Sequence, residues 1–186
     1  MKGARVSRLF VTLGSALLLV GISVVMPPNT VGQGLAGQGG KPAWADVFVS
    51  LGMYSVTYEK PMVGKGEKPQ AYQQKAAYSW TGGRFEIIHV TLARDPAFKE
   101  KYSAEALKKD KNAPKELDIN KKKAWAWEFP REDGKFRQLT HRLVVLLDID
   151  KAIIIEQIGA GLRLEDVAKK FDFSKVEKAL ANPPAK

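Results

Sequence analysis

The part of the chain that most constrains its fold lies between residues 121 and 180, where apolar segments follow one another closely. Residues 143–147 are apolar at every position, as in a strand at the centre of a sheet that is covered on both faces. Just before them, Trp125, Trp127 and Phe129 recur at every second residue, the period of a strand with one packed face. This pattern predicts neighbouring strands in an antiparallel unit.

Further strands are expected on both sides of this core. Residues 152–155 contain three β-branched isoleucines, lie between turn-forming residues and predict a strand that pairs with the preceding one. Earlier in the chain, strands are expected at residues 46–58 (one strand, or two joined near Gly52), 71–80 and 84–92, the last two linked by a two-residue hairpin at Gly82 and Gly83.

Helix signals separate and close these strand runs. Asp95 and Pro96 are suited to the cap and first turn of a helix that carries Phe98, Tyr102 and Ala106 on one face. Near the end of the chain, Leu164, Val167, Ala168 and Phe171 form an apolar stripe, and a capping box predicts a second short helix from Ser174. We therefore predict an α+β fold: a mostly antiparallel sheet of about six strands with one inserted helix and a C-terminal helical segment packed on it.

The N-terminus has the layout of an export leader. Lys2, Arg5 and Arg8 precede residues 9–26, which carry no charge, and Pro27 follows directly. Basic and apolar segments in this order predict a signal peptide or an N-terminal membrane anchor over residues 1–26. Either leaves the domain outside the cytoplasm, as a periplasmic, secreted or membrane-anchored protein that meets the membrane only through residues 9–26 if the leader is uncleaved.

The leader also sets the expected domain boundaries. Residues 27–45, rich in Gly, Pro and Gln, are expected to be a flexible spacer, residues 46–182 a single domain and residues 183–186 a tail. Small residues suited to cleavage end at Ala36 and at Ala45, and the two sites remain alternatives.

Groups able to do chemistry are few. The chain contains no cysteine and two histidines, His89 and His141, both within expected strands. If those strands were neighbours, the histidines and a nearby glutamate could form a metal or acid/base site. Strand histidines at the edge of a core are the simpler interpretation. No catalytic or dinucleotide-binding motif is present, so we expect no catalytic residue and no cofactor, and an enzyme is the less favoured class.

Aromatic residues give a second candidate site. Trp125 and Trp127, together with Trp80 and Tyr78, could line a groove for a sugar or an apolar ligand. The alternative is that these side chains form the core beneath the helices, where large aromatics would help a domain without disulfides to stay folded.

Nine lysines lie between residues 99 and 123 and give a third candidate, a patch for an anionic surface. Its members are Lys108, Lys109, Lys121, Lys122 and Lys123. Five acids are interspersed and no arginine occurs in this run, which favours a solvated surface with at most weak anionic contact and no nucleic acid partner. The net charge of +10 falls to +6 without the four basic residues that precede Asp46, an ordinary level for a soluble domain.

The order of elements, including residues 142–147, the strand at 153–155 and the final helix, resembles the PsbP/Mog-like α/β/α sandwich over residues 46–181. That resemblance implies a non-enzymatic domain that binds or stabilises a protein complex. We therefore expect an exported, non-catalytic module that binds an envelope protein. A small-ligand carrier or sensor using the aromatic face is the second hypothesis, and a hydrolase or metal site near the two histidines is the third.

Overall fold

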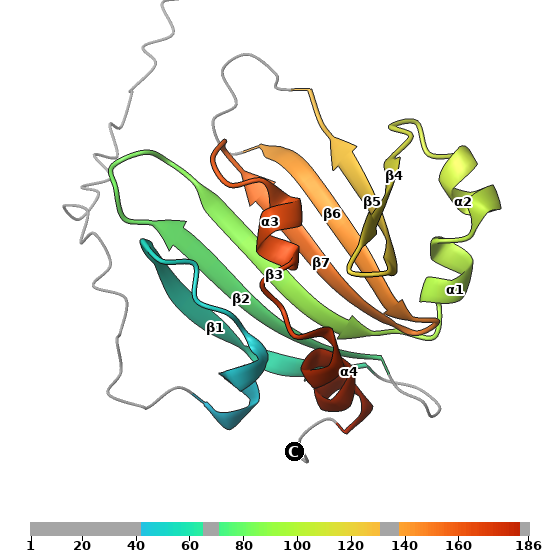
Figure 1. Cartoon of the computed structure of the whole chain (residues 1–186), viewed down its shortest axis with the longest axis horizontal. Coiled ribbons are helices and arrows are strands. Elements are labelled where there is room, and N and C mark those ends of the chain that lie inside the picture. Colours follow the sequence, from blue (N-terminus) through green and yellow to red (C-terminus); the bar gives the residue numbers. More distant parts are fainter. Residues whose placement is uncertain (1–41, 65–70, 131–137, 183–186) are drawn as a thin grey trace, which may run out of the picture. The chain divides into compact units, whose positions relative to one another are not determined.

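One antiparallel sheet organises the computed structural model, which describes residues 42–64, 71–130 and 138–182 (Figure 1). Its seven strands follow the order β1-β2-β3-β7-β6-β5-β4 across the sheet. The bounds are β1 Tyr54–Val63, β2 Tyr72–Trp80, β3 Ile87–Arg94, β4 Lys115–Ile119, β5 Lys122–Glu128, β6 Leu139–Asp148 and β7 Lys151–Ile158. The structure confirms the predicted mostly antiparallel sheet, and the few short helices on it are consistent with the predicted α+β class or with a mostly β fold.

Helical segments lie on both faces of the sheet. The short 3-10 helix η1 (Ala43–Val47) and the helices α3 (Leu164–Ala168) and α4 (Phe173–Ala181) pack on one face. The helices α1 (Phe98–Lys101) and α2 (Ala104–Lys108) contribute to a smaller cluster on the other. Figure 1 shows α3 and α4 in front of the sheet, with α1 and α2 beside its β4–β5 end.

The two clusters meet at β6, as the apolar run of this strand predicts. Leu143 and Val145 point into the larger cluster, whereas Val144 points into the smaller one, and all three side chains are fully buried. Burial on alternating sides of one strand requires cover on both faces. The centre of the sheet is therefore closed on both sides.

The predicted count of about six strands missed β4. This strand, Lys115–Ile119, is a short, charged edge strand that pairs with β5, within the lysine-rich stretch where no strand was predicted. The hairpin turns through Asn120 and Lys121, both with positive φ (51° and 64°). Two successive left-handed residues produce a tight hairpin, but Asn-Lys is a weaker sequence signal for this turn than Asn-Gly.

The N-terminal part of the domain differs from the prediction. In place of a strand from residue 46, η1 is followed by an irregular stretch before β1. Burial recurs at every third position across this region, at Ala45 in η1, at Phe48 and Leu51 in the stretch, and at Tyr54 at the start of β1. Strand β1 begins at Tyr54 and continues to Val63, past residue 58 where the expected strand ends, with a register shift between Glu59 and Met62. The domain therefore begins before residue 46 and includes part of the expected spacer; residues 1–41 lie outside the described residues.

The inserted helix and the last helix also begin differently from the prediction. The Asp95 carboxylate accepts the Ala97 N–H at 2.9 Å in a turn that precedes α1. A second short helix, α2, begins after Ser103, whose hydroxyl accepts the Ala106 N–H at 3.2 Å. The cap of α4 is Asp172, which accepts the Lys175 N–H at 3.0 Å, and not Ser174. The one inserted helix is thus two short helices.

Candidate binding site on the open face of the sheet

The two faces of the sheet are covered unequally. On the closed face, towards η1, α3 and α4, the β2 and β3 side chains Ala76, Tyr78 and Val90 are at most 1% exposed. On the opposite face, the smaller buried cluster includes Ala93 of β3 and no residue of β1 or β2 among the described part of the chain. There Ala77 and His89 are half-buried. We call this part of the sheet, on β1, β2, β3 and β7, the open face.

A row of polar residues crosses the open face. The strand register places His89 opposite Glu156, and Glu156 opposite Arg142. Side chains directly opposite on antiparallel strands lie about 5 Å apart at Cβ. The same register continues to the strands on either side. We call the resulting line of six residues the polar row, after the polar side chains at its centre: Thr57, Ala77, His89, Glu156, Arg142 and Trp127.

The charged groups of the polar row are paired. Arg142 donates through Nε at 2.9 Å and through Nη2 at 2.6 Å to the same oxygen of Glu156. Its guanidinium also lies 5.9 Å from the Phe129 ring centroid. The two charged side chains are 39% and 31% exposed, so the row presents an ordered ion pair at the surface.

Two ionisable groups beside the polar row have shifted pKa values. The Asn112 backbone N–H and then the Trp127 indole, which donates at 2.9 Å, lower the pKa of Asp110 by stabilising its carboxylate. Burial raises the pKa of Tyr102 to about 12, so its phenol is neutral at physiological pH. Asp110 therefore acts as a charged acceptor that holds the Trp127 ring in place.

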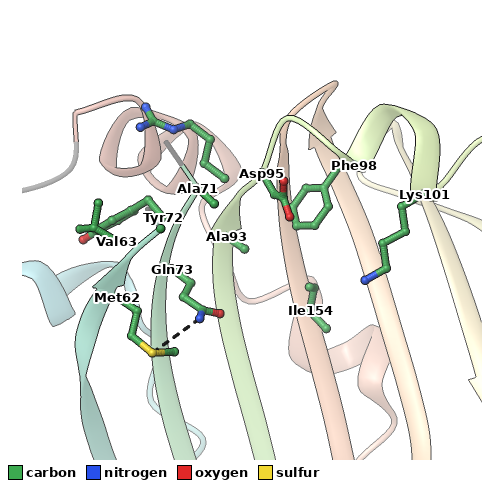
Figure 2. A pocket seen from close by; sticks show the side chains of 12 residues that line it. Met62, Val63, Ala71, Tyr72, Gln73, Ala93, Asp95, Phe98, Lys101 and Ile154 are labelled. Carbon is green, nitrogen blue, oxygen red and sulfur yellow. Dashed lines mark hydrogen bonds between the residues drawn. The ribbon is translucent and has the colours of Figure 1, made fainter. Parts of the chain in front are cut away.

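A hollow of about 420 Å³ lies on the open face at the start of β2 (Figure 2). Its apolar walls come from four elements and include Met62, Ala93, Phe98 and Ile154. Gln73 also lines the hollow, and its amide donates to the Met62 sulfur at 3.8 Å, a weak bond. The hollow is thus mainly apolar, with one adaptable amide.

Three charged residues line this hollow: Arg94, which donates to the Ala181 carbonyl at 3.3 Å, Asp95 and Lys101. Asp95 lies on one side, where its turn bond to Ala97 fixes the carboxylate. Lys101 lies on α1, and Figure 2 shows its side chain extending towards Ile154. The Lys101 ammonium lies 5.6 Å from the Tyr102 ring centroid and forms no ion pair with a carboxylate in residues 42–64, 71–130 or 138–182.

On the closed face, a buried carboxylate joins two loops. The Glu86 carboxylate accepts from the Gln157 amide at 2.9 Å and from the Leu162 N–H at 3.2 Å, and Arg84 lies 3.0 Å away. Burial, and then Glu86, raise the pKa of Tyr54 to about 12. The predicted two-residue turn at Gly82–Gly83 is wrong: a loop of residues 81–86 connects the strands and brings Glu86 inward. We assign this cluster a structural role because Arg84 pairs the Glu86 charge and donors from two other segments hold one of its oxygens.

The two histidines do not share a site. His89 lies on β3 and His141 on β6, and β7 separates these strands. His89 pairs with Glu156 on the open face, whereas His141 pairs with Gln157, whose side chain points to the closed face. A ring nitrogen of His141 lies 3.1 Å from the Thr140 hydroxyl. No group of three or more His, Cys, Asp or Glu residues suited to a metal occurs in the part of the chain that the structure describes.

The predicted aromatic residues lie in two different clusters. Trp125 and Trp127 belong to the smaller cluster, where Trp125 stacks on Tyr102 at 5.7 Å between ring centroids. Tyr78 and Trp80 pack on the closed face. Since these residues lie on opposite sides of the sheet, they do not line a common groove.

The predicted lysine patch is divided. The Lys122 ammonium bonds Glu177 at 2.7 Å and the Leu147 carbonyl at 2.6 Å, so it attaches α4 to the sheet. Lys123 lies 3.8 Å from Glu116. The other members remain exposed in separate places: Lys108 and Lys109 at the end of α2, and Lys121 in the β4–β5 turn.

The residues of the hollow were not among the candidate site residues. They come from β1, β2, β3, β7 and α1, and no local motif links them. The alternation of Gln73, Lys75 and Ala77 with buried neighbours on β2 is the one available signal, because it predicts a face that lacks apolar cover.

Comparison with protein-family models, curated proteins and solved structures found no match. The PsbP/Mog-like resemblance therefore stays a prediction. Among the described residues, no helix is long and apolar enough to cross a membrane; the predicted leader lies outside them.

Proposed function

We propose that this chain is an exported, non-catalytic domain that binds a partner protein of the cell envelope through the open face. The observation that carries this proposal is the unequal cover of the sheet. The closed face buries Ala76, Tyr78 and Val90 beneath helices, whereas Ala77 and His89 on the same strands remain half-exposed. The export part of the proposal rests on the charge and hydropathy of residues 1–26.

The chemistry of the open face supports a protein partner over a nucleic acid or a lipid surface. Polyanions and anionic membranes attract protein surfaces that carry mainly positive charge. Here Arg142 lies opposite Glu156, Lys75 lies opposite Glu59, and small side chains such as Ala77 lie between these pairs. Mixed charges around small apolar residues suit the polar interfaces of non-obligate protein complexes.

The pairing within the polar row supports a binding role over a catalytic one. A general acid or base must reach its substrate with a proton-accepting atom free. In the polar row, the guanidinium of Arg142 engages one oxygen of Glu156 through two donors, which keeps this carboxylate in an ordered ion pair. The arrangement therefore orders a surface rather than presenting a reactive group.

Site-specific photocrosslinking tests the proposed surface. A benzoylphenylalanine replaces Ser79, which is exposed on β2 beside the open face, or Ser174, which is exposed on α4. Irradiation of cells that produce each full-length variant should give one stoichiometric protein crosslink from position 79 and none from position 174. Ser79→Arg should prevent capture of that protein by the tagged chain, and Ser174→Arg should not.

Two results would reject the open face as the partner surface. One is the same crosslink from both positions; the other is capture that survives Ser79→Arg combined with Ala77→Arg. The circular dichroism of each variant shows whether loss of capture reflects unfolding.

A further inference from the structure

We infer that the hollow beside Lys101 binds a small amphiphile with an apolar body and a carboxylate end. The hollow lies on the same open face as the proposed partner surface, beside α1, but its occupant is a small molecule and its test uses the isolated chain. Either proposal can therefore fail while the other stands.

The size and walls of the hollow suit such a ligand. Its volume of about 420 Å³ lies within the range of small-molecule sites, roughly 300 to 1,000 Å³. The strand register explains why space remains there: Gln73, Ala93 and Ala152 lie side by side on β2, β3 and β7. The short Ala93 side chain leaves a low floor between Met62 and Phe98, which form higher walls, and Ala152 beside it is fully buried.

The apolar character of the walls determines the body of the ligand. Met62, Phe98 and Ile154 offer aliphatic and aromatic carbon, and methionine adapts to ligands of different shape. Met62 is 45% exposed, so a ligand beside it would remove apolar surface from water. The Gln73 amide can exchange its weak bond to the Met62 sulfur for a stronger one to a ligand oxygen.

The charges around the hollow determine the sign of the polar end. One oxygen of Asp95 already accepts the Ala97 N–H, which compensates part of its charge within the turn. The Lys101 ammonium has no carboxylate partner among the described residues, and its side chain extends towards the hollow. A carboxylate at the end of the ligand next to α1 supplies the missing counter-charge.

Three probes of equal chain length test this inference: decanoate, decanol and decylamine, each titrated below its micelle concentration into the isotope-labelled full chain. For decanoate, we expect the largest amide chemical-shift changes at Gln73, Ala93, Phe98 and Lys101. Decanoate should bind more tightly than decanol, and decanol more tightly than decylamine.

Matched variants measure separately how the Lys101 charge and the apolar Met62 wall contribute to binding. Lys101→Glu should weaken decanoate binding roughly fivefold to tenfold and leave decanol binding nearly unchanged. Lys99→Glu changes another exposed lysine of α1 that does not line the hollow, and should change neither. Met62→Ala should weaken the binding of all three probes, whereas Met53→Ala, at a methionine that is 62% exposed outside the hollow, should not.

The inference is overturned if decanoate shifts none of these amides, or if Lys101→Glu and Lys99→Glu affect its affinity equally. Equal binding of decanoate and decylamine would contradict the assigned charge. Shifts confined to residues 9–26 would show association with the apolar leader in place of the hollow.

Discussion

The closed and open faces of the sheet use the same strands but have different side-chain chemistry. Along β2, Tyr72, Gln74, Ala76 and Tyr78 are buried towards the helices, while Gln73, Lys75 and Ala77 are half-buried on the other side. The closed face holds aromatic and branched aliphatic side chains, whereas the open face combines alanine and threonine with charged residues. The comparison teaches that one face maintains the fold and the other is available for recognition.

The most direct test of this difference shortens one large aliphatic side chain to alanine on each face. Leu143→Ala on the closed face, at a fully buried position, should lower the free energy of unfolding by about 3 kcal/mol. Ile154→Ala, at a half-buried position that lines the hollow, should lower it by about 1 kcal/mol. Urea unfolding of both variants measures the difference, and equal losses would show that the open face also supports the core.

A second substitution tests how closely the loops at the edge of the closed face pack against the Glu86 carboxylate. Gly161 has no room for a Cβ, because the added atom would collide with the Glu86 carboxylate. Gly161→Ala should therefore lower the free energy of unfolding by about 2 kcal/mol, since it displaces Glu86 from Gln157 and Leu162. Ala160→Ser, at the exposed neighbouring position, is the control. Normal stability of Gly161→Ala, measured in the same urea assay, would mean that the carboxylate moves without cost.

The N-terminal margin of the closed face gives a third test. Trp44 makes edge-on ring contacts with Phe48 and Tyr58, at centroid distances of 6.3 and 5.8 Å. Trp44→Ala should lower the free energy of unfolding by about 1.5 kcal/mol, and Trp44→Phe by less because a ring remains. Thermal unfolding compares the two variants. An unchanged melting temperature for Trp44→Ala would restore residue 46 as the effective start of the domain.

The smallest expected effect lies beside the open face, where a hydrogen-bonded carboxylate holds Trp127. The pKa of Asp110 is lower in the folded state, so its stabilising contribution is present above the unfolded pKa of about 4 and is lost as the pH falls through the folded pKa. Asp110→Asn should therefore be less stable than the unmodified chain at pH 7, and this difference should shrink below pH 4. Glu105→Gln on α2 is the control, and a difference that stays constant with pH would contradict the assignment.

Much of the fold follows from local patterns in the sequence. The strands β5, β6 and β7 were predicted because their apolar runs are long and their turns are clear, and burial at Leu143, Val144 and Val145 confirms the central strand. Strand β4 was not predicted, because its Lys-Glu-Leu-Asp-Ile sequence gains its structure from pairing with β5. The stretch before β1 was misassigned because a buried spacing of three resembles neither strand nor helix.

The candidate site depends on arrangement rather than on local pattern. The face that each histidine occupies follows from residue parity, but their separation follows from β7 lying between β3 and β6, which no local motif encodes. Similarly, Met62 and Phe98 flank one hollow only because β1 extends past its register shift and α1 begins at Phe98. Long-range packing decides such positions, and local patterns in the sequence do not reveal that packing.

The sheet order has a consequence for the chain during synthesis. Strands β1–β2–β3 form one meander and β4–β5–β6–β7 another, and the seam between them is the pairing of β3 with β7. Because β7 ends at Ile158, the emerging chain must hold β3 as an unpaired edge while the next 64 residues, from Asp95 to Ile158, are made. Val90 and Leu92, fully buried in the finished domain, stay exposed to water or to a chaperone for that time. The last strand to be synthesised is therefore the one that closes the centre of the sheet.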